Sequence, residues 1–296
     1  MAKQLSVDGQ VVKAGEKKII DLNISRLVSG TEIDLPIFVY RSKKPGPTVL
    51  LSGGLHGDEI DGIEIIRRMI KSKMFEKLKC GSVIAIPVMN IYGFLNFSRE
   101  VPDGKDVNRF FPGSKTGSLA SRVAYNLTNK VLKEIDFGID FHTGGANRYN
   151  YPQCRFAPND KRAAEIAAVF NAPITLESKL IDRSLRKEAY KMGKSIVVYE
   201  GGESMRFDEL SIKNGIEGAK RVLKHFGMIE TAKASSESVY CQESTWIRAK
   251  RSGLFQAEIS SGEKVKKDDV LARITDPFGK SDVKIKAPED GIIVGH

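Results

Sequence analysis

The sequence is poor in the residues that build disulfide frameworks and membrane spans. Its 296 residues include three cysteines, Cys80, Cys154 and Cys241, which are isolated from one another and form no C-x-x-C pair. This favours a reduced, cytoplasmic protein over a disulfide-rich one or a structural zinc site. No apolar run reaches the roughly 18 residues of a membrane span. The amino-terminal segment also lacks the apolar core of a secretory signal.

Acidic residues are in the minority, with 37 against 47 lysines and arginines and a net charge of +10. Such an excess can indicate nucleic-acid binding, but the basic residues are spread in short bursts along the chain. An RNP pattern, a helix-turn-helix and zinc-finger spacing are all missing. We therefore expect no nucleic-acid partner, and a solvated basic surface that attracts a small substrate carrying a carboxylate. The length suggests about two domains.

Histidine is scarce as well, and two of the four histidines lie in glycine-rich motifs. His56 and Glu59 form an H-x-x-E pair in Gly-Gly-Leu-His-Gly-Asp-Glu (53–59), and His142 lies in Asp-Phe-His-Thr-Gly-Gly (140–145). Two imidazoles and one carboxylate are the ligand set of a catalytic zinc. Each motif alone is weak, because H-x-x-E occurs by chance and a single histidine is usually structural. Together they predict one Zn²⁺ per chain, although other divalent ions also suit this set.

Both motifs are expected where buried strands end. Residues 48–53 and 135–141 are apolar runs typical of strands, and residues 60–70 have helical periodicity. His56 and Glu59 would then lie on a strand-to-helix turn, and His142 would follow directly on the second strand. The carboxyl ends of parallel strands are where α/β proteins build their sites. Asp140 could accept the second N–H of His142 and fix its tautomer.

A zinc hydrolase also needs a general base near the metal. Glu200 ends the predicted strand 195–199 and precedes Gly201-Gly202. Taken alone it is an ordinary glutamate in a surface turn. Beside the two histidine motifs it becomes the best candidate for the base, with Glu203 as its nearest rival.

A long segment between residues 90 and 117, predicted to be a functional loop without secondary structure, carries three more candidates. Arg109 offers a planar fork for a carboxylate, and Asn108 adds a neutral donor. Arg99 could stabilise the oxyanion that forms when water attacks a carbonyl. The alternative is that both arginines are solvated loop charges.

Four motifs in this order resemble the succinylglutamate desuccinylase/aspartoacylase family, which is related to the zinc carboxypeptidases. They are Gly-Gly-x-His-Gly-x-Glu, Asp-x-Asn-Arg-x-Phe-Pro-Gly, Asp-x-His-x-Gly-Gly and a strand ending in glutamate and glycine, spread over about residues 20–225. The resemblance implies an α/β fold, a doubly wound mixed sheet of zinc-carboxypeptidase type with a smaller C-terminal all-β domain. It also implies that zinc is held by His56, Glu59 and His142.

The same resemblance implies roles for four further residues. Glu200 would be the general base and proton shuttle, and Arg99 would polarise the scissile carbonyl. Asn108 and Arg109 would bind the substrate carboxylate. The sequence has Leu-His-Gly-Asp-Glu where true aspartoacylases have Thr-His-Gly-Asn-Glu. It is closer to a branch that includes deacylases of N-acetylated diamino acids, which keeps the amide-hydrolase chemistry and leaves the acyl group and the amine open.

The chain is expected to divide into a catalytic domain (1–231) and a small β domain (239–296), joined by the polar stretch 232–238. After this stretch short strands are predicted at 244–248, 253–259, 270–274, 283–287 and 291–294, resembling the barrel of biotinyl and lipoyl carrier domains. Lys280 does not lie in the sequence context of the lysine that receives the cofactor in carrier domains. We therefore expect a structural domain that shapes access to the site or forms an oligomer contact. The sequence ends just after an apparent inner strand, so a barrel that lacks its last one or two strands is an alternative.

These features together predict a zinc-dependent hydrolase that cleaves the amide bond of an N-acyl amino acid or a related small carboxylate. A carboxypeptidase-like peptidase acting on short or γ-linked peptides is the alternative within enzymes, since the same zinc and Asn-Arg pair would serve it. A catalytically silent binding protein is the alternative from another class. Whether the chain forms a homo-oligomer stays open.

Overall fold

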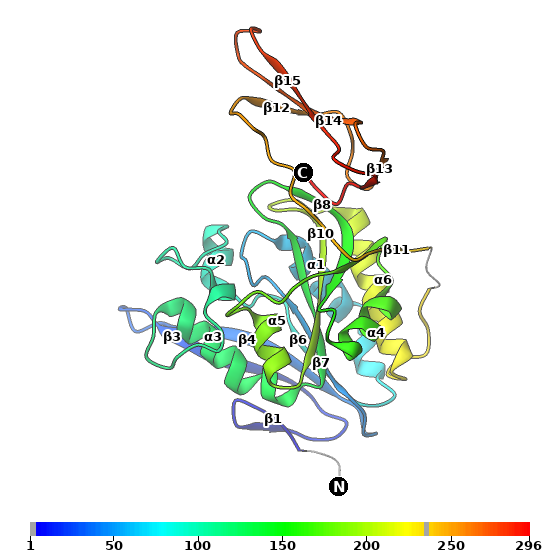
Figure 1. The fold of residues 1–296 in the computed structure, drawn as a ribbon. Coiled ribbons are helices and arrows are strands. Elements are labelled where there is room, and N and C mark those ends of the chain that lie inside the picture. The colour runs from blue at the N-terminus through cyan, green and yellow to red at the C-terminus, as the bar shows by residue number, and fades with distance from the viewer. Residues whose placement is uncertain (1–3, 234–236) are drawn as a thin grey trace.

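A nine-stranded mixed sheet forms the centre of the molecule, in the order β11-β9-β8-β10-β7-β5-β6-β4-β3. The computed structural model describes residues 4–233 and 237–296, so part of the predicted linker 232–238 lies outside it (Figure 1). The strands are β3 (Lys17–Arg26), β4 (Glu32–Arg41), β5 (Thr48–Gly53), β6 (Ser82–Ile86), β7 (Phe137–Gly144), β8 (Tyr149–Phe156), β9 (Ile174–Glu177), β10 (Ser195–Glu203) and β11 (Val239–Cys241). A small hairpin of β1 (Leu5–Val7) and β2 (Gln10–Val12) precedes them.

The middle of the sheet is parallel. β6, β5, β7 and β10 run in one direction, whereas β8 is antiparallel to β10, and β4 and β3 close the other side as antiparallel strands. All residues of β5, β6 and β7 are buried. Near-continuous apolar runs are typical of parallel strands covered on both faces.

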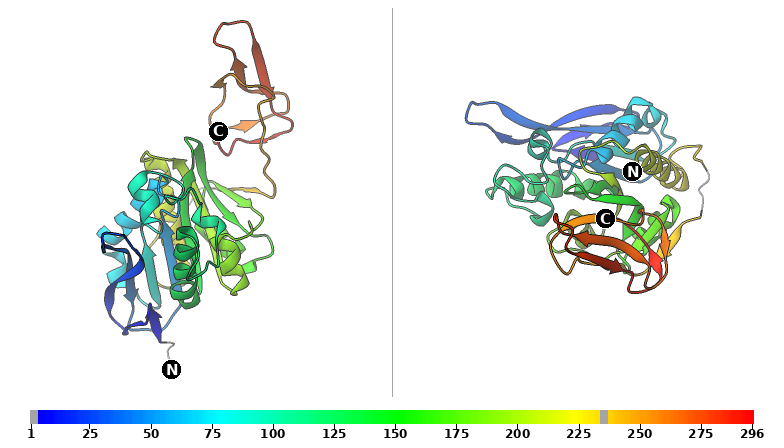
Figure 2. Two further views of the ribbon diagram at one scale, coloured as in Figure 1. Left: turned by 90° about the vertical axis from the view of Figure 1, so that its left-hand side faces the viewer. Right: turned by 90° about the horizontal axis from the view of Figure 1, so that it is seen from above.

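Helices cover the two faces of the sheet, and two apolar cores result (Figures 1 and 2). One core contains residues of α3 (Leu119–Lys130) and α5 (Leu185–Lys191), and the other contains residues of α1 (Ile60–Lys71), α4 (Lys161–Phe170) and α6 (Glu209–His225). Along β5, Leu50 belongs to the first core, while Val49 and Leu51 belong to the second. This alternation follows from the two-residue period of a strand. The predicted doubly wound α/β class is confirmed.

The local predictions are partly wrong. The strand at 48–53 and the helix after it are confirmed, but residues 90–117 are not a loop throughout. They contain α2 (Ile91–Asn96) and a 3₁₀ turn at Val107–Arg109. The side chain of Asn90 accepts a hydrogen bond from the N–H of Gly93, so it caps α2. Further 3₁₀ turns lie at Met74–Lys77 and Leu132–Glu134.

A C-terminal β region stands beyond one end of the sheet (Figure 2). β12 (Leu254–Ala257), β14 (Val270–Thr275) and β15 (Asp282–Lys286) form one antiparallel sheet, and β13 (Lys264–Val265) pairs with β16 (Gly291–Ile292). Val265, Leu271 and Ala287 form its small core. The strand predicted at residues 244–248 is wrong, because these exposed residues have no strand partner in the structure. In the described part of the chain, no helix has the length and apolarity needed to cross a membrane.

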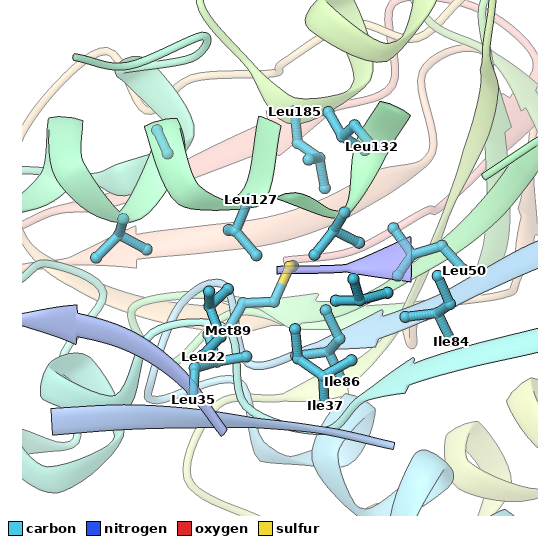
Figure 3. Close-up of a cluster of buried hydrophobic side chains, with 14 of the residues drawn as sticks. Leu22, Leu35, Ile37, Leu50, Ile84, Ile86, Met89, Leu127, Leu132 and Leu185 are labelled. Atoms are coloured by element: carbon cyan, nitrogen blue, oxygen red, sulfur yellow. The ribbon is translucent and has the colours of Figure 1, made fainter. Parts of the chain in front are cut away.

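The core around Leu50 should be sensitive to loss of volume. Its side chain is packed among residues of β4, β6, α3 and α5, among them Ile37, Ile84 and Leu185 (Figure 3). Leu50→Ala removes these contacts and leaves a cavity, so the free energy of unfolding should fall by about 2–5 kcal/mol in urea titrations. Leu210→Ala, at an exposed position of α6, is the control. Equal stability of both variants would contradict this packing.

Candidate active site

Three potential metal ligands meet at the carboxyl ends of β5 and β7. His56 lies on the turn after β5, Glu59 is the N-cap residue of α1, and His142 lies within β7. β5 and β7 are neighbouring parallel strands, with Gly53 opposite Phe141, so the turn after β5 reaches His142. One donor atom from each residue lies within 4.8 Å of the others, and all three side chains are buried. The prediction that His142 follows its strand is wrong, because β7 continues to Gly144.

The turn that carries His56 depends on a close backbone approach. Gly57 donates its N–H to the carbonyl of Ser98 at 2.9 Å. A Cβ atom at position 57 would lie 1.8 Å from the carbonyl carbon of Gly93, so no side chain fits there. Glycine is therefore required for the segment 93–98 to pack against the turn.

Glu59 lies between the two histidines. Its Oε1 is 2.6 Å from Nδ1 of His56, and its Oε2 is 2.7 Å from Nδ1 of His142. The Nε2 of His142 donates to Asp140 at 2.8 Å, and Asp140 in turn accepts from the hydroxyl of Ser52. Each ring thus directs Nδ1 toward the common centre. A carboxylate on the far side of a histidine is the usual support of a metal-ligating ring.

The electrostatics of this group follow from its burial and its charges. Burial alone would raise the pKa of Glu59, but the two imidazoles hold that pKa well below its usual range. Burial lowers the pKa of His142, yet Asp140 and Glu59 outweigh this and raise it well above the ordinary value. A cation that binds here therefore competes with protons for the ring nitrogens. The donor set, its burial and its supporting carboxylates fit a divalent metal ion.

Arg99 lies at the edge of this group. Its Nη1 is 3.2 Å from Nδ1 of His56 and 3.5 Å from Oε1 of Glu59. Nε and Nη2 donate to Asp106 at 3.1 and 2.8 Å, which anchors the guanidinium. The side chain is 33% exposed, so a solute can reach it. Asp106, whose other oxygen is 3.4 Å from Nε2 of His56, begins the Asp-x-Asn-Arg motif and received no role from the sequence.

Asn108 and Arg109 lie beside Asp106 but differ in their contacts. The side-chain oxygen of Asn108 accepts from the backbone N–H of Leu185, which ties this segment to the start of α5. Arg109 donates to the carbonyl of Asn108 at 2.7 Å and lies 3.8 Å from Asp106. Its side chain is 43% exposed. Asp106 therefore gathers Arg99 and Arg109 on one side of the His-Glu-His group.

Glu200 lies next to the metal ligands from the other side. It is the register partner of His142 on the parallel strand β10, so both side chains leave the sheet on the same face. Its Oε2 accepts from Nδ2 of Asn150 at 2.8 Å, and its Oε1 is 3.4 Å from Arg155. The prediction that it ends its strand is wrong, because β10 runs on to Glu203. Glu203 pairs with Gly144, past a register shift and further from His142.

A polar cluster on β8 and α5 was not predicted from the sequence. Gln153 is buried opposite Glu200, and Arg155 lies two residues along on the same face. Arg186 is also buried, and it donates to the hydroxyl of Ser178 and the carbonyl of Lys179. Burial and the charge of Arg155 lower the pKa of Arg186 to about 10, against a smaller opposing effect of Glu200. These residues lie in no recognisable motif, so only the pairing of β8 with β10 reveals them.

A His-Glu-His group that can hold a metal ion, at the carboxyl ends of adjacent parallel strands, places the chain among the doubly wound α/β proteins that build their sites at strand ends. Residues 45–226 match the family model described as the succinylglutamate desuccinylase/aspartoacylase catalytic domain. The chain therefore belongs to the succinylglutamate desuccinylase/aspartoacylase family, and the resemblance seen in the sequence is confirmed.

Individual relatives are similar over most of the chain. An N-alpha-acetyl-L-2,4-diaminobutyric acid deacetylase of Halomonas elongata is 28% identical over 283 residues, covering 88% of this chain and 80% of the relative. The product-bound structure of the ectoine utilization protein EutE (DoeB) from Ruegeria pomeroyi has a TM-score of 0.87 at 25% identity, covering 100% and 94% of the two chains. A succinylglutamate desuccinylase structure from Silicibacter sp. TM1040 has a TM-score of 0.85 at 25% identity, covering 95% and 89%.

A buried carboxyl group lies two residues after Glu59. Asp61, in the first turn of α1, accepts a hydrogen bond from the N–H of Asp208, the N-cap residue of α6, at 3.1 Å. Burial raises the pKa of Asp61 to about 8, although the hydrogen bond from Asp208 acts in the opposite direction. Gly202 leaves it room, since a Cβ atom there would lie 2.2 Å from Oδ2 of Asp61.

The raised pKa of Asp61 makes stability depend on pH. The folded chain keeps this proton up to about pH 8, whereas the unfolded chain releases it near 3.8. The contribution of Asp61 to stability is therefore fully present below about pH 4 and is lost as the pH rises to about 8, by about 1.4 kcal/mol per pH unit at most. Asp61→Asn should remove this dependence and be the more stable protein at pH 8, measured by urea unfolding at pH 5 and 8. Asp182→Asn, at an exposed side chain, should leave the slope unchanged. A wild-type slope in Asp61→Asn would contradict the assignment.

Proposed function

We propose that this protein is a zinc-dependent hydrolase that removes the acyl group from a small N-acyl amino acid. The observation that carries the proposal is the meeting of the buried His56, Glu59 and His142 group with Glu200 on one side and Arg99 on the other. The names of the relatives support it, since the Halomonas elongata protein is a deacetylase of an acylated diamino acid.

Zinc would be held by His56, Glu59 and His142. When bound, it lowers the pKa of a water molecule and polarises a carbonyl group. The chain supplies the support: Asp140 fixes the tautomer of His142, and the N–H of Thr143 donates to Glu59 Oε2 at 3.2 Å. These contacts keep the carboxylate and the ring in place when the proton on Nδ1 of His142 leaves.

Glu200 is assigned as the general base. Its carboxylate accepts a proton from the attacking water and later gives that proton to the nitrogen of the leaving amine. Arg99 donates to the oxygen that becomes negative when the carbonyl is attacked, and Asp106 holds this guanidinium in place beforehand. Because the donor is already oriented, little reorganisation is needed during the reaction.

Asn108 and Arg109 are assigned to the substrate carboxylate. The exposed guanidinium of Arg109 offers two parallel N–H donors to such a group. Asn108 uses its side-chain oxygen to accept from Leu185, so its amide nitrogen faces the other way and is available as a donor. We also propose the division into a catalytic domain (1–231) and a small β domain (239–296), whose first residues, β11 (Val239–Cys241), pair with β9 at the edge of the central sheet. A cytoplasmic location is proposed as well, and it agrees with the free state of Cys80, Cys154 and Cys241.

Metal content tests the ligand assignment. The purified chain, supplied with zinc, should carry about one Zn²⁺ per molecule by elemental analysis, and His142→Ala should lose it because one of three ligands is gone. His225→Ala is the matched control, since His225 is exposed and pairs with Glu165 outside the site. A wild-type chain that takes up no metal would favour a silent binding protein instead.

Turnover tests the base. With N-acetyl-L-2,4-diaminobutyrate, N-succinylglutamate and short peptides as substrates, the wild-type chain should release the free amine from an N-acyl amino acid. Glu200→Gln should keep its zinc and lose about 10²–10⁴-fold in kcat, because an amide cannot accept the proton. Glu203→Gln is the control and should retain activity. Near-normal activity of Glu200→Gln would make the base assignment wrong, and cleavage of peptides alone would favour the peptidase.

A further inference from the structure

The end of the described chain pairs with the strand beside the proposed base. The N–H of Tyr149 donates to the carbonyl of His296 at 2.9 Å, and the N–H of His296 donates back at 3.1 Å. Next to this pair, the N–H of Tyr151 donates to the carbonyl of Val294 at 2.8 Å. Figure 1 shows the C-terminal residues at the ends of β8 and β10. Residues 294–296 thus extend the sheet at the start of β8.

Asn150 lies between this end segment and Glu200. Its Nδ2 donates to Oε2 of Glu200 at 2.8 Å, and its backbone is bridged to Gly295. A Cβ atom at position 295 would lie 2.7 Å from the side-chain oxygen of Asn150 and 2.4 Å from the carbonyl of Tyr149. Only glycine therefore allows the end segment and the amide of Asn150 to occupy their places together.

The end segment is itself held by the C-terminal β region. The hydroxyl of Ser261 lies 2.9 Å from Nδ1 of His296. The ring of Tyr151 packs on Gly262, where a Cβ atom would lie 2.6 Å from the ring. Together with the backbone pairs, these contacts join the start of β8 to the β region at several points.

We propose that Asn150 is a positioning residue for Glu200, and that residues 294–296 of the C-terminal β region hold Asn150 in place. The inference rests on the proposed function of Glu200 as the base. It gives the β region a part in the reaction, because that region would set the orientation of a carboxylate it does not itself contact.

The physical reason is the freedom of a glutamate side chain. With several rotatable bonds, the carboxylate of Glu200 can leave the productive orientation at little cost unless its oxygens are held. Asn150 holds Oε2, and Arg155 lies near Oε1, so the plane of the carboxylate is defined from both sides. Misplacement of a reacting group by about 1 Å can cost 10²-fold in rate.

The kinetic test separates positioning from binding, with N-acetyl-L-2,4-diaminobutyrate as the substrate. Asn150→Ala should lower kcat about tenfold or more and leave KM within about twofold, because only the base is disordered. Asn129→Ala, at an exposed asparagine of α3, is the control. Gly295→Ala should lower kcat in the same way, whereas Gly291→Ala should not, because a Cβ atom there meets nothing within 4 Å. The double variant of residues 150 and 295 should be no slower than Asn150→Ala.

A second readout does not depend on turnover. In ¹⁵N-labelled full-length protein, the side-chain amide signals missing from Asn150→Ala belong to Asn150. Glu200→Ala and Gly295→Ala should both shift these signals, and Gly291→Ala should leave them unchanged. Unshifted signals in the first two variants, or a fall in kcat from Gly291→Ala equal to that from Gly295→Ala, would overturn the inference.

The two proposals can fail separately. Absent turnover, or an active Glu200→Gln variant, would remove the base assignment while the amide signals still report the link between the β region and Glu200. An inactive Glu200→Gln variant beside fully active Asn150→Ala and Gly295→Ala variants would leave the base in place and reject the positioning role.

Discussion

The parallel pairing of β7 with both β5 and β10 is the constraint on which the site depends. The pairing with β5 brings the turn that carries His56 and Glu59 to the end of β7. The pairing with β10 sets Glu200 directly opposite His142. A shift of one residue in either register would turn a whole set of side chains to the other face of the sheet. The buried apolar residues of these strands, which belong to two different cores, therefore also fix the chemistry at their ends.

Charge balance decides how the polar residues can coexist at this place. Glu59, Asp106 and Asp140 face His56, His142 and Arg99, so that nearly every buried charge has an opposite partner. Burial of an unpaired charge would cost several kcal/mol. The arrangement tolerates two neutral histidines once a divalent cation supplies the positive charge, since the carboxylates then face the cation instead of protons.

The sequence was informative where function depends on local pattern. The glycine-rich turn after β5, the histidine motif of β7 and the order of the four motifs were enough to predict the fold class and the family. It was less informative where pairing is non-local: β8, with Asn150, Gln153 and Arg155, was not predicted as a strand. Its polar residues face the site and obscure the apolar alternation that marks a strand. Asn90 is a second example of a feature that the sequence did not reveal. Its side chain caps α2, which lies within a segment predicted to be a loop.

The antiparallel course of β8 has a consequence for diversity within such a fold. A parallel strand after β7 would need a crossover past the opposite end of the sheet, whereas β8 returns after a short connection at residues 145–148. The wall beside the His-Glu-His group is therefore a short loop that joins β7 to β8 past the end of β10, outside both apolar cores. Insertions or deletions in this loop would reshape the space beside the three ligands without repacking the interior. Evolution could therefore change the size of the accepted ligand at this loop while the geometry of the three side chains stays the same.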